Sequence, residues 1–69
     1  MKFLLMMQVC SALHMSCMDS MEAGMYKTHF DCATAGYLNA IGLTWEVGED
    51  ISNRDRITIK FECKPVTAT

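Results

Sequence analysis

The chain has 69 residues, a formal net charge of −2 and a pI near 5.5. This length makes one domain, and the Lys and Arg residues are not clustered with aromatic residues, which disfavours nucleic-acid binding. No apolar run reaches the roughly 20 residues that a membrane-spanning helix needs. A domain this small rarely gains more than about 3–5 kcal/mol from its core, so disulfides, a metal or a partner are expected to add stability.

The first segment, Met1–Val9, supports two interpretations. Its length and apolar character predict a buried strand at about 2–9. Alternatively, its basic start, its short apolar stretch and the small residues Ser11 and Ala12 resemble a signal peptide. In that case residues 1–12 would be cleaved and the remainder exported.

Two weakly patterned segments follow. Cys10–Cys17 is predicted to be a connection that can include an edge strand around Leu13–Cys17. Met18–Phe30 is rich in methionine, and we expect residues 11–30 to form an ordered loop over one end of the sheet. Asp19 or Ser20 would cap a single helical turn there, which Gly24 would end.

The long helix is predicted at about 32–47, with Asp31 as its N-cap and Gly48 as its stop. Its internal glycines, Gly36 and Gly42, weaken it by roughly 1 kcal/mol each relative to alanine. A glycine inside a helix often marks the close approach of another backbone. A helical period places one apolar stripe against the sheet, formed by Ala33, Tyr37, Ala40, Ile41, Thr44 and Val47. Leu43 falls on the opposite side.

After a linker at Ile51–Asp55, the last strand is predicted at Arg56–Cys63 from strict alternation. Ile57, Ile59, Phe61 and Cys63 share the buried face, and Thr58, Lys60 and Glu62 share the wet one. Pro65 is expected to end the strand, leaving a tail over 65–69.

These elements predict a small α/β fold, with one helix on a two- or three-stranded sheet in the order β-loop-α-β. The chain is expected to enter the helix at the end of the sheet where the first strand ends, so the last strand is predicted to run parallel to the first, joined to it by a right-handed crossover. Under that topology all four cysteines gather at one end of the sheet.

Four cysteines allow three disulfide connectivities. We favour Cys32–Cys63, which ties the first helical turn to the last strand, and Cys10–Cys17 then follows by elimination. The main alternative pairs Cys17 with Cys32 and Cys10 with Cys63. Such bridges typically add about 2–4 kcal/mol each, and they imply an oxidising compartment, periplasmic or extracellular.

A metal site is the competing use of the sulfur atoms. Zinc could take four thiolates, or three with His29, although the chain lacks the usual Cys-x2-Cys spacing. A Cu(I) site would use thioether, thiolate and imidazole ligands, here His14, Met15, Cys17, Met18, Met21 and Met25. The simpler interpretation is that methionine fills irregular gaps in the core, and no cofactor is expected.

No catalytic constellation is recognisable, so we expect a protein that is not an enzyme. Cys32, at a helix N-terminus, would be the most reactive thiol if it were free. Tyr37, Leu38 and Trp45 are weighed separately as exposed apolar residues of the helix. They predict either a surface for a protein or membrane partner, or a patch that the Met-rich loop covers.

A series of short motifs runs along nearly the whole chain. It consists of Met1-Lys2-Phe3-Leu4-Leu5 leading into Cys10-Ser11, then Cys17, Asp31-Cys32 with Gly36-Tyr37, Gly48, Asn53, and Ile57-x-Ile59-Lys60-Phe61-x-Cys63. In this order the motifs resemble a group of small uncharacterised four-cysteine proteins of marine bacteriophages and related environmental sequences. That group often has a proline-containing loop where Met18-Asp19-Ser20 stands here. It also often has charged residues in place of Leu38, Leu43 and Trp45.

The resemblance implies a phage-encoded accessory protein and assigns no role to any residue. The first functional hypothesis is therefore a non-enzymatic interaction protein stabilised by disulfides. The alternatives are a soft-metal-binding protein and an exported peptide.

Overall fold

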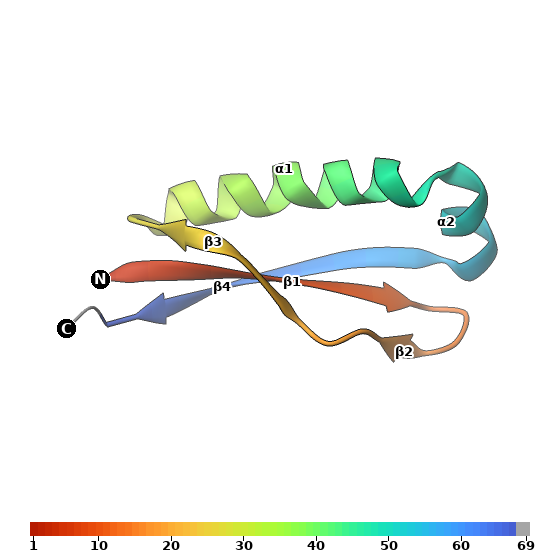
Figure 1. Cartoon of the computed structure of the whole chain (residues 1–69), viewed down its shortest axis with the longest axis horizontal. Coiled ribbons are helices and arrows are strands. Elements are labelled where there is room, and N and C mark those ends of the chain that lie inside the picture. The colour runs from red at the N-terminus through yellow and green to blue at the C-terminus, as the bar shows by residue number, and fades with distance from the viewer. Residues whose placement is uncertain (68–69) are drawn as a thin grey trace.

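The computed structural model describes residues 1–67 as a four-stranded antiparallel sheet with helices on one side. The elements are β1 (Lys2–Ser11), β2 (Ser16–Cys17), β3 (Met21–Tyr26), α1 (His29–Val47), α2 (Glu49–Asp55) and β4 (Ile57–Val66). Figure 1 shows α1 lying along one face of the sheet, with α2 at the far end from the start of β1. The predicted small α/β class is confirmed.

The first strand is the centre of the sheet. β1 pairs antiparallel with β4 along its whole length, from Lys2 opposite Val66 to Ser11 opposite Ile57. On its other side β1 pairs with β3 and, at its end, with the two-residue β2. The prediction of parallel first and last strands is wrong, and the sheet has more strands than the predicted two or three.

The strand direction follows from β3, which lies where a loop was predicted. β3 carries the chain back beside β1 before α1 begins, so α1 runs in the direction of β1 and β4 returns antiparallel. A helical turn capped by Asp19 or Ser20 is also wrong, because Glu22 pairs with Met6 in the ladder. The ladder has a bulge between Leu5 and Met6, and pairing of this kind can override weak local patterning.

The predicted edge strand around residues 13–17 is reduced to β2. Residues 12–15 form the turn that joins β1 to β2, and Met15 takes a left-handed conformation there with φ of 54°. A non-glycine residue in this region usually marks a turn.

α1 begins three residues before the predicted start. Thr28 is the N-cap, and its side-chain oxygen accepts a hydrogen bond from the backbone N–H of Asp31 at 3.0 Å. Thr28 therefore takes the role that we predicted for Asp31. Asp31 lies inside the first turn, where its negative charge still complements the helix dipole.

The helix face that packs on the sheet is rotated from the predicted one. Cys32 and Gly36 are buried, and Leu43, which was predicted to lie on the far side, packs against the core. Tyr37 and Ile41, which were predicted to lie on the core stripe, are 66% and 56% exposed. Thr44 is exposed as well, whereas Ala33, Ala40 and Val47 are half-buried.

Gly36 explains this rotation. A Cβ atom built at Gly36 would clash with the ring of Phe61 on β4. The glycine therefore admits an aromatic side chain, whereas the sequence predicted the approach of a backbone. Tyr37, the next residue, packs edge-on against the same ring with the ring centroids 4.8 Å apart.

The segment after Gly48 is a second helix, whereas a linker was predicted. Gly48 separates α1 from α2 with φ of 91°, a conformation that glycine adopts easily. Glu49 and Asp50 occupy the first turn of α2, where acidic side chains are stabilising.

β4 confirms the alternation read from the sequence. Its odd-numbered residues from Ile57 to Cys63 are half-buried towards α1, and Thr58, Lys60 and Glu62 are exposed. Pro65 does not end the strand, which continues to Val66. Within the described residues β4 pairs on one side only, and an edge strand tolerates a proline. The last two residues of the predicted tail lie outside the described part.

The core is thin. Its central cluster consists of Leu5, Met7 and Cys32, and the molecule measures 44 × 20 × 13 Å along its principal axes. One layer of helix on one sheet cannot bury much more, which is why covalent cross-links matter for a chain of this size.

Candidate interaction surface

Both favoured disulfides are present. Cys32 in the first turn of α1 is bonded to Cys63 on β4, and 31 residues separate them in the sequence. The bond lies in the core, because Cys32 has no exposed surface and Cys63 packs beside it. It fixes the beginning of α1 onto the sheet.

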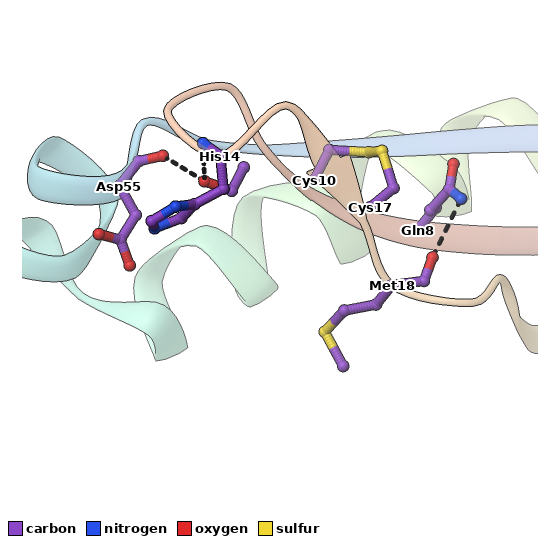
Figure 2. The surroundings of a disulfide bond; sticks show 7 residues. Gln8, Cys10, His14, Cys17, Met18 and Asp55 are labelled. Carbon is purple, nitrogen blue, oxygen red and sulfur yellow. Dashed lines mark hydrogen bonds between the residues drawn. A yellow bond between two sulfur atoms is a disulfide. The ribbon is translucent and has the colours of Figure 1, made fainter.

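The second disulfide lies at the opposite end of the molecule. Cys10 on β1 is bonded to Cys17, its direct neighbour on β2, as Figure 2 shows. The prediction that all four cysteines gather at one end is therefore wrong, because β4 is antiparallel to β1. Cys63 lies opposite Leu5, whereas Cys10 lies opposite Thr58.

Two hydrogen bonds at Met18 hold the chain beside the Cys10–Cys17 disulfide. The Met18 N–H donates to the carbonyl of Val9 at 2.8 Å. The Gln8 side-chain amide donates to the carbonyl of Met18 at 3.0 Å, as Figure 2 shows. Gln8, a polar residue within the apolar sequence of β1, therefore holds the connection between β2 and β3.

A further set of hydrogen bonds joins this turn to α2. The Ser11 hydroxyl donates to the carbonyl of Asp55 at 2.8 Å, and the Leu13 N–H donates to the same oxygen at 3.3 Å. The Asp55 side chain pairs with Arg54 at 3.1 Å. Hydrogen bonding from Arg54 lowers the pKa of Asp55, and the neighbouring charges of Arg54 and His14 act in the same direction.

The candidate soft-metal ligands are placed as follows. Cys17 is held in a disulfide, which removes its thiolate. His14 and Met15 lie in the turn, Met18 lies in the following connection, and Met21 and Met25 lie on β3. In residues 1–67 no group of three or more His, Cys, Asp or Glu side chains is arranged to hold a metal ion.

The methionines do not cover the helix. Met15, Met18, Met21 and Met25 are between 47% and 90% exposed, and Met7 is the methionine that fills the core. The interpretation that a Met-rich loop covers Tyr37, Leu38 and Trp45 is wrong, because those side chains are 66%, 65% and 81% exposed.

The large exposed apolar residues of α1 gather on one face, which we term the outer face. It comprises Phe30, Tyr37, Leu38, Ile41 and Trp45, with the exposed Thr34 among them. At 100° per residue these side chains cover the side of α1 above β4 and the side away from the sheet. The contact of Tyr37 with Phe61 establishes which side faces β4.

Sequence reasoning found three of the apolar members and missed Phe30 and Ile41. Phe30 was assigned to the preceding loop, and Ile41 was assigned to the core. The signal that could have found them is the spacing of Phe30, Tyr37 and Ile41, which are seven and then four residues apart. That spacing places the three side chains on one side of a helix.

A shallow groove of about 240 Å³ runs between the outer face and β4. It is lined by Tyr37, Ala40, Ile41, Thr44, Trp45 and Ile59. Its walls are mostly apolar side chains of two different elements, so an apolar group placed there would contact both the helix and the strand edge.

Comparison of the chain with protein-family models, with curated proteins and with solved structures finds no match. Among the described residues, no helix has the length and apolar character to cross a membrane. The geometry of the molecule itself therefore carries the functional argument.

Proposed function

We propose that this protein is a non-enzymatic interaction protein that binds another protein through the outer face of α1. The observation that carries the proposal is the exposure of five large apolar side chains on one helix, with Trp45 at 81%. Aromatic residues are enriched at protein interfaces and dominate their binding energy. Clustered exposure of this kind on a small domain marks a binding site.

A protein partner fits the outer face better than a membrane does. Helices that lie on a membrane surface usually carry Lys and Arg beside the apolar face. α1 contains neither, and its charged residues are Asp31 and Glu46. The anionic surface of a membrane would therefore repel this helix.

The disulfides support a rigid scaffold for this surface. Cys32–Cys63 fixes the N-terminal end of α1, so the outer face is presented in one orientation relative to β4.

Because all four cysteines are paired, the framework is consistent with an oxidising compartment. We infer a location in the periplasm or outside the cell, and the resemblance to small phage proteins favours an accessory role.

The interpretation of residues 1–12 as a cleaved signal fits this scaffold poorly. Cleavage there would remove β1, which pairs with every other strand, and would break the Cys10–Cys17 bridge. We expect the intact mass of the mature protein to include these residues. A mass lacking the first twelve would contradict the retained strand.

The experiment is site-specific photo-crosslinking. A benzoyl-phenylalanine placed at Ile41 should cross-link to a protein in the cells that naturally make this chain. The control is the same residue at Met25, which is similarly exposed at 52% but lies on β3 away from the outer face. Equal labelling at both positions, or cross-links from Ile41 to lipid alone, would contradict the proposal.

A further inference from the structure

The outer edge of β4 is a second surface that lies beside the outer face. β4 is ten residues long and, in the part of the chain that the structure describes, pairs only with β1. The backbone groups on its other side are therefore available to another strand. Proteins usually protect such an edge with charged side chains, proline, bulges or a covering element, and β4 carries Lys60, Lys64 and, near its end, Pro65.

The charges on β4 alternate in sign. Lys60, Glu62 and Lys64 follow one another on the exposed face of the strand, and the Lys64 ammonium lies 3.7 Å from the Glu62 carboxylate. A row of lysines alone would repel a second copy of the strand. A row with a glutamate in the middle can instead complement itself.

We propose that two copies of this chain associate through their β4 edges, antiparallel, about a twofold axis at Phe61. The two sheets would become one continuous sheet, and the two outer faces would meet across the axis. This inference rests on the proposed function, since it names a second copy of the chain as the protein that the outer face binds.

The charge pattern selects the register. Centring the pairing on Phe61 places Lys60 opposite the Glu62 of the other copy, twice by symmetry, and opposite charges in such cross-strand pairs are stabilising. Centring it on Lys60 or on Glu62 places like charges opposite each other. Centring it on Cys63 also pairs opposite charges, Glu62 with Lys64, but shortens the paired segment.

The helix geometry agrees with this arrangement. A twofold axis perpendicular to the sheet keeps both α1 helices on the same face and makes them antiparallel. α1 lies over β1 and β4, through Cys32–Cys63 and through the contact of Gly36 with Phe61. If a second sheet is added at the usual strand spacing of about 4.8 Å, each α1 lies about one strand spacing from the twofold axis. The two helix axes are then roughly 10 Å apart, which is typical of packed helices.

The groove between α1 and β4 would be the centre of this interface. Tyr37 and Ile41 lie on the side of α1 that faces the axis, and they line the groove together with Ile59. The other copy would bring the same side chains to the same place. Phe30 extends the seam towards the helix start, with the short side chain of Thr34 between it and Tyr37, so the seam carries no charge.

The first test is the oligomeric state of the oxidised 69-residue chain, measured by sedimentation velocity over a range of concentrations. We expect a concentration-dependent dimer. Lys60→Glu, which places like charges opposite each other twice, should weaken it by about tenfold. Combining Lys60→Glu with Glu62→Lys should restore the affinity to within about threefold, because the swapped charges are again opposite.

The charge swap also separates the two acceptable registers. In the register centred on Cys63, Lys60 faces no charge, so Lys60→Glu alone would have little effect. The double swap would instead weaken binding, because Glu62→Lys places a positive charge opposite Lys64 twice. Either result, or a wild-type chain that stays monomeric at all concentrations, would overturn the proposal. Both positions are exposed, and thermal unfolding checks that each variant is folded.

The second test concerns the helix seam. Ile41→Lys should abolish the dimer, whereas Met25→Lys, at a similarly exposed position on β3, should leave it intact. Equal loss in both variants would overturn the proposal. A monomeric wild-type chain whose Ile41 position still cross-links to a different protein would overturn the dimer alone and leave the proposed function standing.

Discussion

The two ends of this molecule are held together by different means. At the end where β1 starts, Cys32–Cys63 lies in the core beside Leu5, and Gly36 packs against Phe61. At the other end, the Cys10–Cys17 bridge joins adjacent strands, and hydrogen bonds to Asp55 tie the turn to α2. The first end depends on burial and a long-range cross-link, whereas the second depends on local bonds at the surface.

This difference predicts an order of importance. A disulfide stabilises mainly by restricting the unfolded chain, and more so when it closes a longer loop. The separation of 31 residues for Cys32–Cys63 against 7 for Cys10–Cys17 corresponds in that model to about 3.5 kcal/mol against about 2.5 kcal/mol. Removing Cys32–Cys63 also removes buried contacts, because Cys32 is completely buried. The loss of stability for this disulfide should therefore exceed the loop-closure value.

The largest effect is expected from Cys32→Ala combined with Cys63→Ala. The variant should lose about 4 kcal/mol or more, which is comparable to the whole stability that a domain this small can gain from its core. We expect the variant to be already unfolded at about 37 °C, so that circular dichroism shows no cooperative thermal transition above that temperature. A transition within a few degrees of the wild type would show that this end does not depend on the cross-link.

Cys10→Ala combined with Cys17→Ala should cost less, about 2.5 kcal/mol, and should leave a folded protein. Hydrogen exchange should then increase at residues 11–18 while β4 stays protected.

Cys17 is exposed and Cys32 is not, so mild reductant should open Cys10–Cys17 first. Alkylation followed by mass mapping gives the order, and prior loss of Cys32–Cys63 would contradict the comparison.

The same contrast between packed and open sites applies within α1 and offers a matched pair of variants. Gly36→Ala should destabilise by about 1–3 kcal/mol, since the new methyl group meets the Phe61 ring. Gly42→Ala, with nothing within 4 Å of the added atom, should stabilise by about 1 kcal/mol through helix propensity. Chemical denaturation measures both free energies, and a change of the same sign in the two variants would refute the packing argument.

The sequence predicted the features that depend on a local period. The alternation of residues 57–63 gave β4 and its buried face correctly, and the long helix was found. The Cys32–Cys63 pairing was also correct, because it required only that the start of the helix and the end of the last strand lie at the same end. That condition holds in the antiparallel sheet as well.

The remaining features depend on tertiary contacts. β3 has no alternation that would reveal it, since its place is determined by pairing with β1 across a bulge. Without β3, the direction of β4 could not be derived. The rotation of α1 was ambiguous because the helix has two apolar faces. The burial of Cys32 and the fit of Phe61 against Gly36 decide between them.

For the candidate site, the sequence singled out Tyr37, Leu38 and Trp45 as a possible surface, and their exposure is observed. Ile41 was assigned to the buried stripe because it follows Tyr37 at helical spacing. Both residues belong to the outer face, so the spacing was read correctly, but the buried face of the helix is rotated from the predicted stripe.

The smallest expected effect concerns pH at the α2 end. Arg54 lowers the pKa of Asp55 in the folded protein, so the ionised carboxylate favours folding. This stabilisation is fully present above the unfolded-state pKa of about 3.9, and it is lost as the pH falls through the lower folded-state value. Asp55→Asn should therefore lower the melting temperature slightly near neutral pH and leave it nearly unchanged in strong acid.

Arg54→Gln provides the control, because it removes the cation and keeps the carboxylate. Both variants should show the same reduced dependence of melting temperature on pH, and the double variant should add little, since the two side chains act as one pair. The hydrogen bonds from Ser11 and Leu13 go to the backbone carbonyl of Asp55, so neither substitution removes them. If Asp55→Asn instead destabilised the protein equally at both pH values, the side chain would act through packing, and this end would resemble the other more than the structure indicates.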